Sequence, residues 1–135
     1  MVEMIAIKRV AMKKLIIGLL IFVSSACLAQ STDKITQHQL LVNQMSVSPF
    51  TIIDVRSAAE FSDGHIKGAI NIPFDEIDQH QEALSKLRGD TLVVYCRSGR
   101  RAGIFIKELL PKGYKLKHLE GDMQKWQASS MPIVN

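Results

Sequence analysis

The chain has 135 residues, of which 47% are hydrophobic, and it carries a formal net charge of +4. This length predicts one domain with a core of ordinary size, and the hydrophobic content excludes a largely disordered chain. The sequence holds no internal repeat, low-complexity segment or second domain.

The first residues form a leader that precedes the domain. Two lysines stand before an apolar run, 15–23, and small residues follow it. This order predicts a secretory signal peptide over residues 1–29, and the apolar run is too short to span a membrane comfortably. Because Met12 opens a more typical signal than Met1, residues 1–11 are interpreted as an upstream mis-start.

Two ways of processing this leader remain open. Residues 27–29 offer small side chains at the positions that a signal peptidase recognises, which predicts a soluble periplasmic protein that begins near Gln30. Residues 24–27 instead resemble a weak lipobox, which would place a lipid anchor on Cys27. Soluble export is favoured, because the leucine usual in a lipobox is replaced by Ser24.

The mature chain begins with a polar tether, 30–34, and the predicted domain covers 35–135. Thr36 is predicted to cap a helix that carries Leu40, Leu41 and Met45 inward. The next element, 50–55, is apolar throughout, which is typical of a buried parallel strand.

Strands and helices alternate along the rest of the chain. Ser57 and Glu60 form a capping box that begins a short helix, and Asp75 is predicted to cap a later one. Further strands are predicted over 69–72, 91–95 and 116–119, with a helix over 101–110 and a last small helix carrying Met123 and Trp126. This alternation predicts an α/β fold of three layers, with a small, mainly parallel sheet covered by helices on both faces. In such sheets, ligands bind beyond the carboxyl ends of the strands.

The strand 91–95 ends on a cysteine, Cys96, at this functional edge. A short basic loop follows, and the helix after it has apolar residues at helical spacing. Backbone N–H groups of the loop and the positive end of the helix dipole favour a thiolate, as do the charges of Arg97, Arg100 and Arg101. The alternative is a small buried residue that ends a strand. The glycine and the arginines favour the reactive thiol.

Cys96 is also the only thiol that remains after cleavage at Ala29, so no intramolecular disulfide can form. Without the leader the chain has 13 basic and 12 acidic residues, or a net charge of +1. The overall basic balance therefore does not indicate a nucleic-acid partner. Positive charge concentrated around Cys96 suits a small anionic substrate.

Four motifs, in order, resemble those of single-domain rhodanese sulfurtransferases, and the resemblance covers about residues 35–134. They are Asp54-Val55-Arg56, Gly64 to Pro73, Cys96-Arg97-Ser98-Gly99-Arg100-Arg101, and Leu119 to Met123 with Trp126. The resemblance implies a rhodanese-like fold and a thiosulfate sulfurtransferase that carries sulfur as a persulfide on Cys96. It implies an active-site loop formed by Arg97, Ser98, Gly99, Arg100 and Arg101, no cofactor or metal, and a thiol or an acceptor protein as partner.

The sequence departs from this family near the C-terminus. The usual Gly-Gly is Gly121-Asp122, and Ser129-Ser130 replaces an Ala-Gly pair. These changes are expected to touch the C-terminal closure, to put details of the substrate pocket in doubt, and to leave the cysteine loop intact.

Several polar residues outside the loop are candidates for supporting roles. Asp54 and Arg56 are expected to form a structural ion pair near the pocket rim rather than to act directly, although Glu60 is another partner for Arg56. His65 is expected to order its turn through hydrogen bonds, with a general base as the alternative. The remaining histidines have no ligand spacing, so no metal site is predicted. Trp126 is expected in the core.

Two rival functions stay open. A phosphatase or arsenate reductase of the same fold needs an arginine where this chain has Ala102, which makes that activity less favoured. A persulfide carrier without efficient turnover is compatible with the single thiol.

Overall fold

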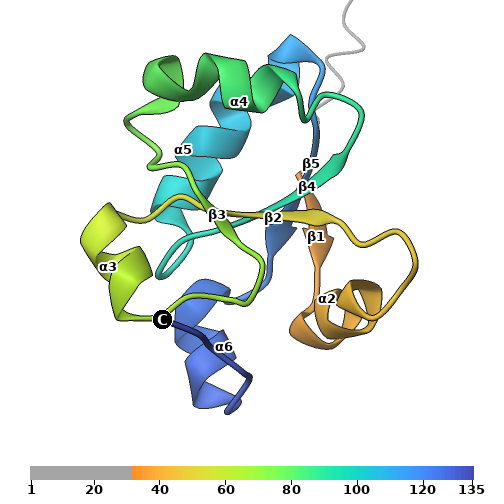
Figure 1. Ribbon diagram of the computed structural model, residues 1–135, viewed down its shortest axis with the longest axis vertical. Helices are drawn as coiled ribbons and strands as arrows, with labels where there is room; N and C mark the ends of the chain where they lie inside the picture. The colour runs from red at the N-terminus through yellow and green to blue at the C-terminus, as the bar shows by residue number, and fades with distance from the viewer. Residues whose placement is uncertain (1–31) are drawn as a thin grey trace, which may run out of the picture. The chain divides into compact units, whose positions relative to one another are not determined.

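The computed structural model describes residues 32–135. The predicted signal peptide, Cys27 and the first two residues of the predicted tether lie outside the described residues. The sheet has five parallel strands in the order β1-β5-β4-β2-β3 (Figure 1). The strands are β1 (Asp33–Ile35), β2 (Thr51–Asp54), β3 (Ile70–Asn71), β4 (Thr91–Tyr95) and β5 (Lys115–Leu119). The predicted α/β fold with a parallel sheet is confirmed.

Helices cover both faces of this sheet. Figure 1 places α4 and α5 on one side of it and α2 and α6 on the other. The helices are α2 (Gln37–Gln44), α3 (Ala58–Asp63), α4 (Gln81–Ser85), α5 (Arg100–Leu109) and α6 (Asp122–Ala128), with 3₁₀ turns η1 (Ile77–His80) and η2 (Leu110–Lys112). Within residues 32–135, no helix has the length and hydrophobicity needed to span a bilayer.

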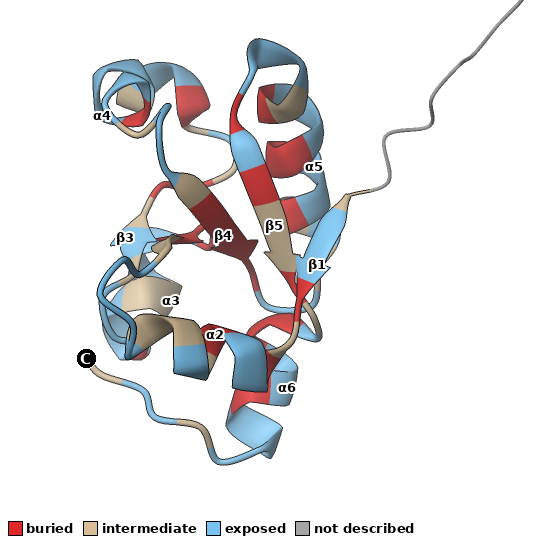
Figure 2. Ribbon diagram, turned by 90° about the vertical axis from the view of Figure 1, so that its right-hand side faces the viewer, coloured by how far each residue is buried: buried red, intermediate tan, exposed pale blue. Residues whose placement is uncertain are grey.

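Two hydrophobic cores form because successive strand residues point to opposite faces. Leu92 and Val94 of β4 pack in the core on the α5 side, whereas Val93 and Tyr95 pack in the core that holds Trp126. In Figure 2 the buried residues run along β4 and the side of α5 that faces the sheet. Being buried on both faces, β4 holds its carboxyl end, and therefore Cys96, in a fixed place.

The two predicted helix starts are confirmed in detail. Thr36 Oγ1 accepts the Gln39 N–H at 3.1 Å, and Gln39 Oε1 accepts the Thr36 N–H at 2.9 Å, which completes a capping box. Ser57 and Glu60 form the predicted capping box at the start of α3. Both boxes satisfy backbone N–H groups that a helix leaves without partners at its first turn.

Three local predictions were wrong. Asp33 and Lys34, assigned to the tether, belong to β1, because backbone pairing with β5 does not require apolar side chains at an edge. Asp75 caps no helix, since a backbone turn from the Glu76 N–H to the Pro73 carbonyl leads directly into η1. Met45 follows the last residue of α2 and is 75% exposed.

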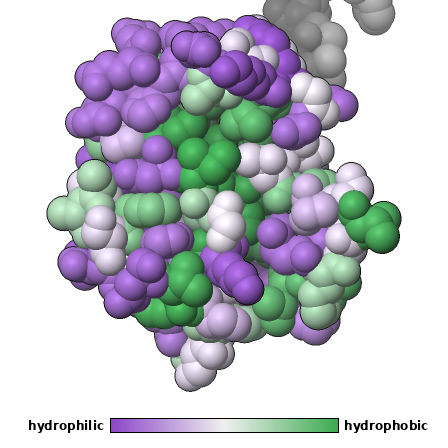
Figure 3. Space-filling model, in the orientation of Figure 1, coloured by the Kyte–Doolittle hydropathy of each residue, from purple (hydrophilic) through white to green (hydrophobic). Residues whose placement is uncertain are grey.

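Met45 belongs to a small group of exposed apolar side chains around the end of α2, together with Val42 and Val47. Ile70, Ile104 and Ile133 are also exposed. Figure 3 shows hydrophilic side chains over α4 and hydrophobic ones gathered at the centre of the same face.

Candidate active site

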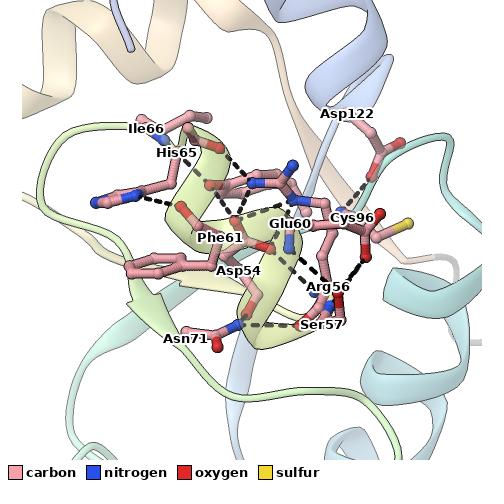
Figure 4. A network of polar contacts seen from close by, with 12 residues as sticks. Asp54, Arg56, Ser57, Glu60, Phe61, His65, Ile66, Asn71, Cys96 and Asp122 are labelled. Carbon is pink, nitrogen blue, oxygen red and sulfur yellow. Dashed lines mark hydrogen bonds and ion pairs between the residues drawn. The ribbon is translucent and has the colours of Figure 1, made fainter. Parts of the chain in front are cut away.

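Cys96 lies directly after β4, at the carboxyl edge of the sheet. The residue is 1% exposed and forms part of the core on the α5 side. Its sulfur nevertheless has a polar partner, because the Gly99 N–H donates to Sγ across an N···S distance of 3.0 Å. In Figure 4 this sulfur points away from the polar network of Asp54 and Arg56. The thiol therefore packs like a core residue while its sulfur accepts a hydrogen bond from the following loop.

The loop from Cys96 to α5 turns at Gly99, which has a φ of 117°. A backbone in this region suits glycine, since side chains disfavour positive φ. Ser98 is exposed, and Arg100 and Arg101 form the first turn of α5. The positive end of the helix dipole thus begins directly after the residue that donates to the sulfur.

The three arginines of the loop have different surroundings. Arg101 forms two hydrogen bonds to the Glu60 carboxylate, at 2.7 and 2.9 Å. The Arg101 guanidinium, helped by the Ser57 hydrogen bonds, lowers the pKa of Glu60 to about 2 against the opposing effect of burial. Arg100 lies over the Phe74 ring, with its guanidinium carbon 5.9 Å from the ring centre. Within residues 32–135, the exposed Arg97 side chain forms no ion pair.

Asp54 and Arg56 form a buried ion pair, as predicted, at the end of β2 (Figure 4). Their side chains are joined by a contact of 2.6 Å, and Arg56 also donates to the Gly64 carbonyl at 2.7 Å. The Tyr95 hydroxyl donates to Asp54 at 2.7 Å and accepts the Ile66 N–H. Burial, together with the Asp54 charge, raises the pKa of Tyr95, which keeps this hydroxyl protonated as a donor.

This network corrects the suggested pairing of Glu60 with Arg56. Glu60 pairs with Arg101 instead, because the Arg56 guanidinium is turned inward by Asp54 and Gly64. His65 orders its turn, as expected: its Nδ1 lies 2.8 Å from the Phe61 carbonyl, and the two rings stack at 3.7 Å.

Two residues missed by the sequence analysis lie against the loop. Asp122 Oδ1 accepts the Cys96 N–H at 2.9 Å, and His118 Nε2 lies 3.0 Å from the same oxygen. Asp122 is 2% exposed. The expectation that Gly121-Asp122 leaves the cysteine loop untouched was therefore wrong, because α6 begins beside Cys96. The i, i+4 spacing of a histidine and a carboxylate across a strand end was the available signal.

A cavity of about 310 Å³ lies beside the loop. Side chains of α3, the loop and α6 line it, and Cys96 does not. The lining residues are Arg56, Glu60, Asp63, Gly64, Arg97, Met123, Gln124 and Gln127. Trp126 is a core residue, as expected, and its indole N–H donates to the Pro132 carbonyl at 2.9 Å. Within residues 32–135, no group of three His, Cys, Asp or Glu side chains could hold a metal ion.

Residues 36–129 match the family described as "Rhodanese-like domain". The chain belongs to this family. A solved structure of a rhodanese-related protein from Thermoplasma volcanium agrees: its TM-score is 0.67 at 28% identity, over 76% of this chain and 97% of that one. The rhodanese-like assignment therefore rests on sequence and fold together.

Relatives of this rhodanese-like chain have different names. It is 37% identical over 62 residues to the thiosulfate sulfurtransferase PspE of Escherichia coli, covering 46% of this chain and 60% of PspE. It is 33% identical over 109 residues to the HTH-type transcriptional regulator Rv0324 of Mycobacterium tuberculosis, covering 78% of this chain and 46% of the regulator. The matches thus span less than two thirds of both relatives, and of the two only PspE is named as a sulfurtransferase.

Proposed function

We propose that this chain is a sulfurtransferase that moves a sulfane sulfur from an anionic donor to a thiophilic acceptor through a persulfide on Cys96. The observation that carries the proposal is the hydrogen bond from the Gly99 N–H to Sγ, beside the N-terminus of α5. Hydrogen-bond donors and a positive helix end favour the anionic form of a sulfur atom. The similarity to PspE supports thiosulfate as the donor.

In the first step, the Cys96 thiolate attacks the outer sulfur of thiosulfate. A new S–S bond forms to Sγ, and the S–S bond of thiosulfate breaks. Its electron pair leaves with sulfite, so the negative charge of the thiolate passes to the terminal sulfur of the persulfide. The Gly99 N–H and its neighbours in the loop would stabilise this charge, as an oxyanion hole stabilises oxygen.

In the second step, an acceptor attacks the terminal sulfur and regenerates the Cys96 thiolate. The acceptor would be a thiol or an acceptor protein in the cell and cyanide in an assay. Neither step requires an organic cofactor or a metal ion. Arg97, whose charge is not paired within residues 32–135, would attract the anionic donor, and Arg100 would assist it.

The N-terminal sequence supports a further part of the proposal. A leader over residues 1–29 would send the domain to the periplasm, where it would meet its donor as a soluble protein. The alternative is a lipoprotein anchored through Cys27. Nucleic acid is not among the partners proposed here.

The test is the intact mass of the protein purified from cells that express the full chain, before and after thiosulfate. We expect Cys96 to gain one sulfur atom, which a reducing thiol removes and which Cys96→Ser does not acquire. The mass before treatment also identifies the N-terminus and any lipid. Loading without turnover of cyanide would favour a persulfide carrier. A protein that stays unloaded but hydrolyses phosphate esters or reduces arsenate would overturn the proposal.

A further inference from the structure

We infer that Asp122, held by His118, is a positioning residue. It fixes Cys96 and also Gly99, whose N–H donates to the Cys96 sulfur. The inference rests on the proposed function for its catalytic consequence. It concerns residues outside the cysteine loop, on β5 and α6. Three observations carry it: the hydrogen bonds to the Cys96 peptide groups, the close approach to Gly99, and the contact of His118 with the Asp122 carboxylate.

Residues at the start of α6 form hydrogen bonds to both the N–H and the carbonyl of Cys96. Asp122 Oδ1 accepts the Cys96 N–H at 2.9 Å. The Met123 N–H donates to the Cys96 carbonyl at 3.0 Å, and the Gln124 N–H donates to the Arg97 carbonyl at 3.0 Å. A side chain and two backbone groups of one short segment therefore determine where the cysteine lies.

Asp122 and His118 also pack against Gly99, whose N–H donates to the sulfur. A Cβ built on Gly99 would lie 3.1 Å from Asp122 Oδ2 and 3.4 Å from His118 Cε1. The first distance is shorter than ordinary contact, so a side chain at position 99 would crowd the carboxylate. Asp122 therefore lies directly beside the residue whose N–H points at Sγ, and we expect its position to influence that N–H.

The local geometry argues against a purely structural role as a helix cap. The cap of α6 is Gly121, and no side chain caps this helix. Asp122 has a φ of 53°, a left-handed conformation that aspartate tolerates better than most residues. Its carboxylate points at the cysteine loop instead of at the N–H groups of its own helix.

His118 holds the Asp122 carboxylate in place, since His118 Nε2 lies 3.0 and 3.1 Å from the two carboxylate oxygens. One of these oxygens, Oδ1, is the atom that accepts the Cys96 N–H. The contact with His118 therefore fixes the orientation of the acceptor that positions Cys96.

Two substitutions at position 122 distinguish the loss of the hydrogen bond to the Cys96 N–H from an effect of backbone strain at the positive φ. Asp122→Gly suits the positive φ and removes the acceptor, whereas Asp122→Asn also suits it and keeps a carbonyl oxygen for the Cys96 N–H. His118→Asn removes the imidazole that contacts the carboxylate. His38→Asn, at an exposed position on α2, is the matched histidine control.

The experiment measures kcat and KM for thiosulfate, with thermal unfolding as the control for folding. We expect Asp122→Gly to lower kcat by up to about 100-fold, since misplacement of reacting atoms by about 1 Å costs about this much. KM should change little, Asp122→Asn should recover most of kcat, and His118→Asn should lower kcat less than Asp122→Gly does, because it leaves the acceptor for the Cys96 N–H in place. Equal kcat in wild type and Asp122→Gly, or an Asp122→Asn variant as impaired as Asp122→Gly, would overturn the inference.

A second measurement does not depend on sulfur transfer. The amide proton signals of Cys96 and Gly99 in NMR spectra should shift in Asp122→Gly and stay in place in His38→Asn; unmoved signals would contradict the positioning role. Wild-type protein that never acquires sulfur would refute the proposed function alone, and these signals would still decide whether Asp122 positions the loop.

Discussion

Two buried carboxylates stand on either side of β4, and they are paired in different ways. Asp54, from β2, is bound by the Arg56 guanidinium and the Tyr95 hydroxyl. Asp122, which follows β5, is bound by a backbone N–H and by His118. The arginine is a permanent charge whose planar guanidinium donates to both carboxylate oxygens, whereas a backbone N–H is a single neutral donor fixed by the chain.

The two carboxylates also differ in what they hold. The Asp54 network ties Gly64 and Ile66 to the sheet, and within residues 32–135 it forms no side-chain hydrogen bond to Cys96. The Asp122 carboxylate accepts the Cys96 N–H directly. Asp54 therefore supports the fold around the site, whereas Asp122 supports the cysteine itself.

The largest expected effect is a loss of stability when the Asp54 network is broken. Asp54→Ala leaves the Arg56 guanidinium buried without its partner, which should lower the free energy of unfolding by about 3–5 kcal/mol. Urea unfolding measures this loss. Asp122→Gly is the comparison, and it should cost clearly less. Equal losses for the two substitutions would remove the distinction between the two carboxylates.

A smaller loss is expected from Tyr95→Phe. The ring still packs in the core, but Asp54 loses a hydrogen bond of 2.7 Å and the Ile66 N–H loses its acceptor. Hydrogen bonds to charged groups contribute about 1.5–3 kcal/mol, so we expect a loss of about 2 kcal/mol by urea unfolding.

Tyr114→Phe is the matched control for this prediction. Tyr114 is also buried, and its hydroxyl forms no hydrogen bond to any of the residues that the structure describes. It should therefore change the free energy of unfolding by less than about 0.5 kcal/mol. A Tyr95→Phe protein as stable as this control would show that the Asp54 network does not depend on the hydroxyl.

The sequence predicted the fold and the Asp54–Arg56 pair better than the contacts around Cys96. The alternation of strands and helices, the two capping boxes and the Asp54–Arg56 pair each follow from residues close together in the chain. Asp122 was set aside as part of the C-terminal closure, and His118 as one of several scattered histidines. Their contact with Cys96 depends on the order of strands, which brings β5 beside β4, and local patterns do not specify that order.

Charge around the cysteine was overestimated for the same reason. The sequence places three arginines next to Cys96, but the fold brings Glu60 against Arg101 from 41 positions away. The position of the arginines beside Cys96 follows from the sequence, whereas the pairing of Arg101 with Glu60 could not be predicted from it.

This difference between the arginines gives the next prediction. Arg97→Ala should raise the KM for thiosulfate by about three- to tenfold, since attraction of the donor is lost, with a smaller change in kcat. Arg101→Ala should raise KM less, because Glu60 already offsets that charge. Steady-state kinetics at two salt concentrations measures both effects, and Arg97→Lys should retain most of the attraction. A larger KM effect at Arg101 than at Arg97 would contradict this assignment.

The smallest expected effect is the contribution of Glu60 to stability in acid. Its pKa is lowered from 4.5 to about 2, chiefly by Arg101, so folding is favoured above pH 4.5 and this contribution is lost as pH falls from 4.5 towards 2. Since the Glu60 side chain is 33% exposed, we expect only about 1 kcal/mol after solvent screening. Glu60→Gln should lower the free energy of unfolding at pH 7 by about this amount, and it should differ less from wild type as pH falls, because the pair then no longer stabilises the wild-type protein. Urea unfolding at several pH values measures this convergence. Because glutamine can still complete the capping box with Ser57, as Gln39 does with Thr36, a difference that stays constant down to pH 2 would contradict the role of the Glu60 charge.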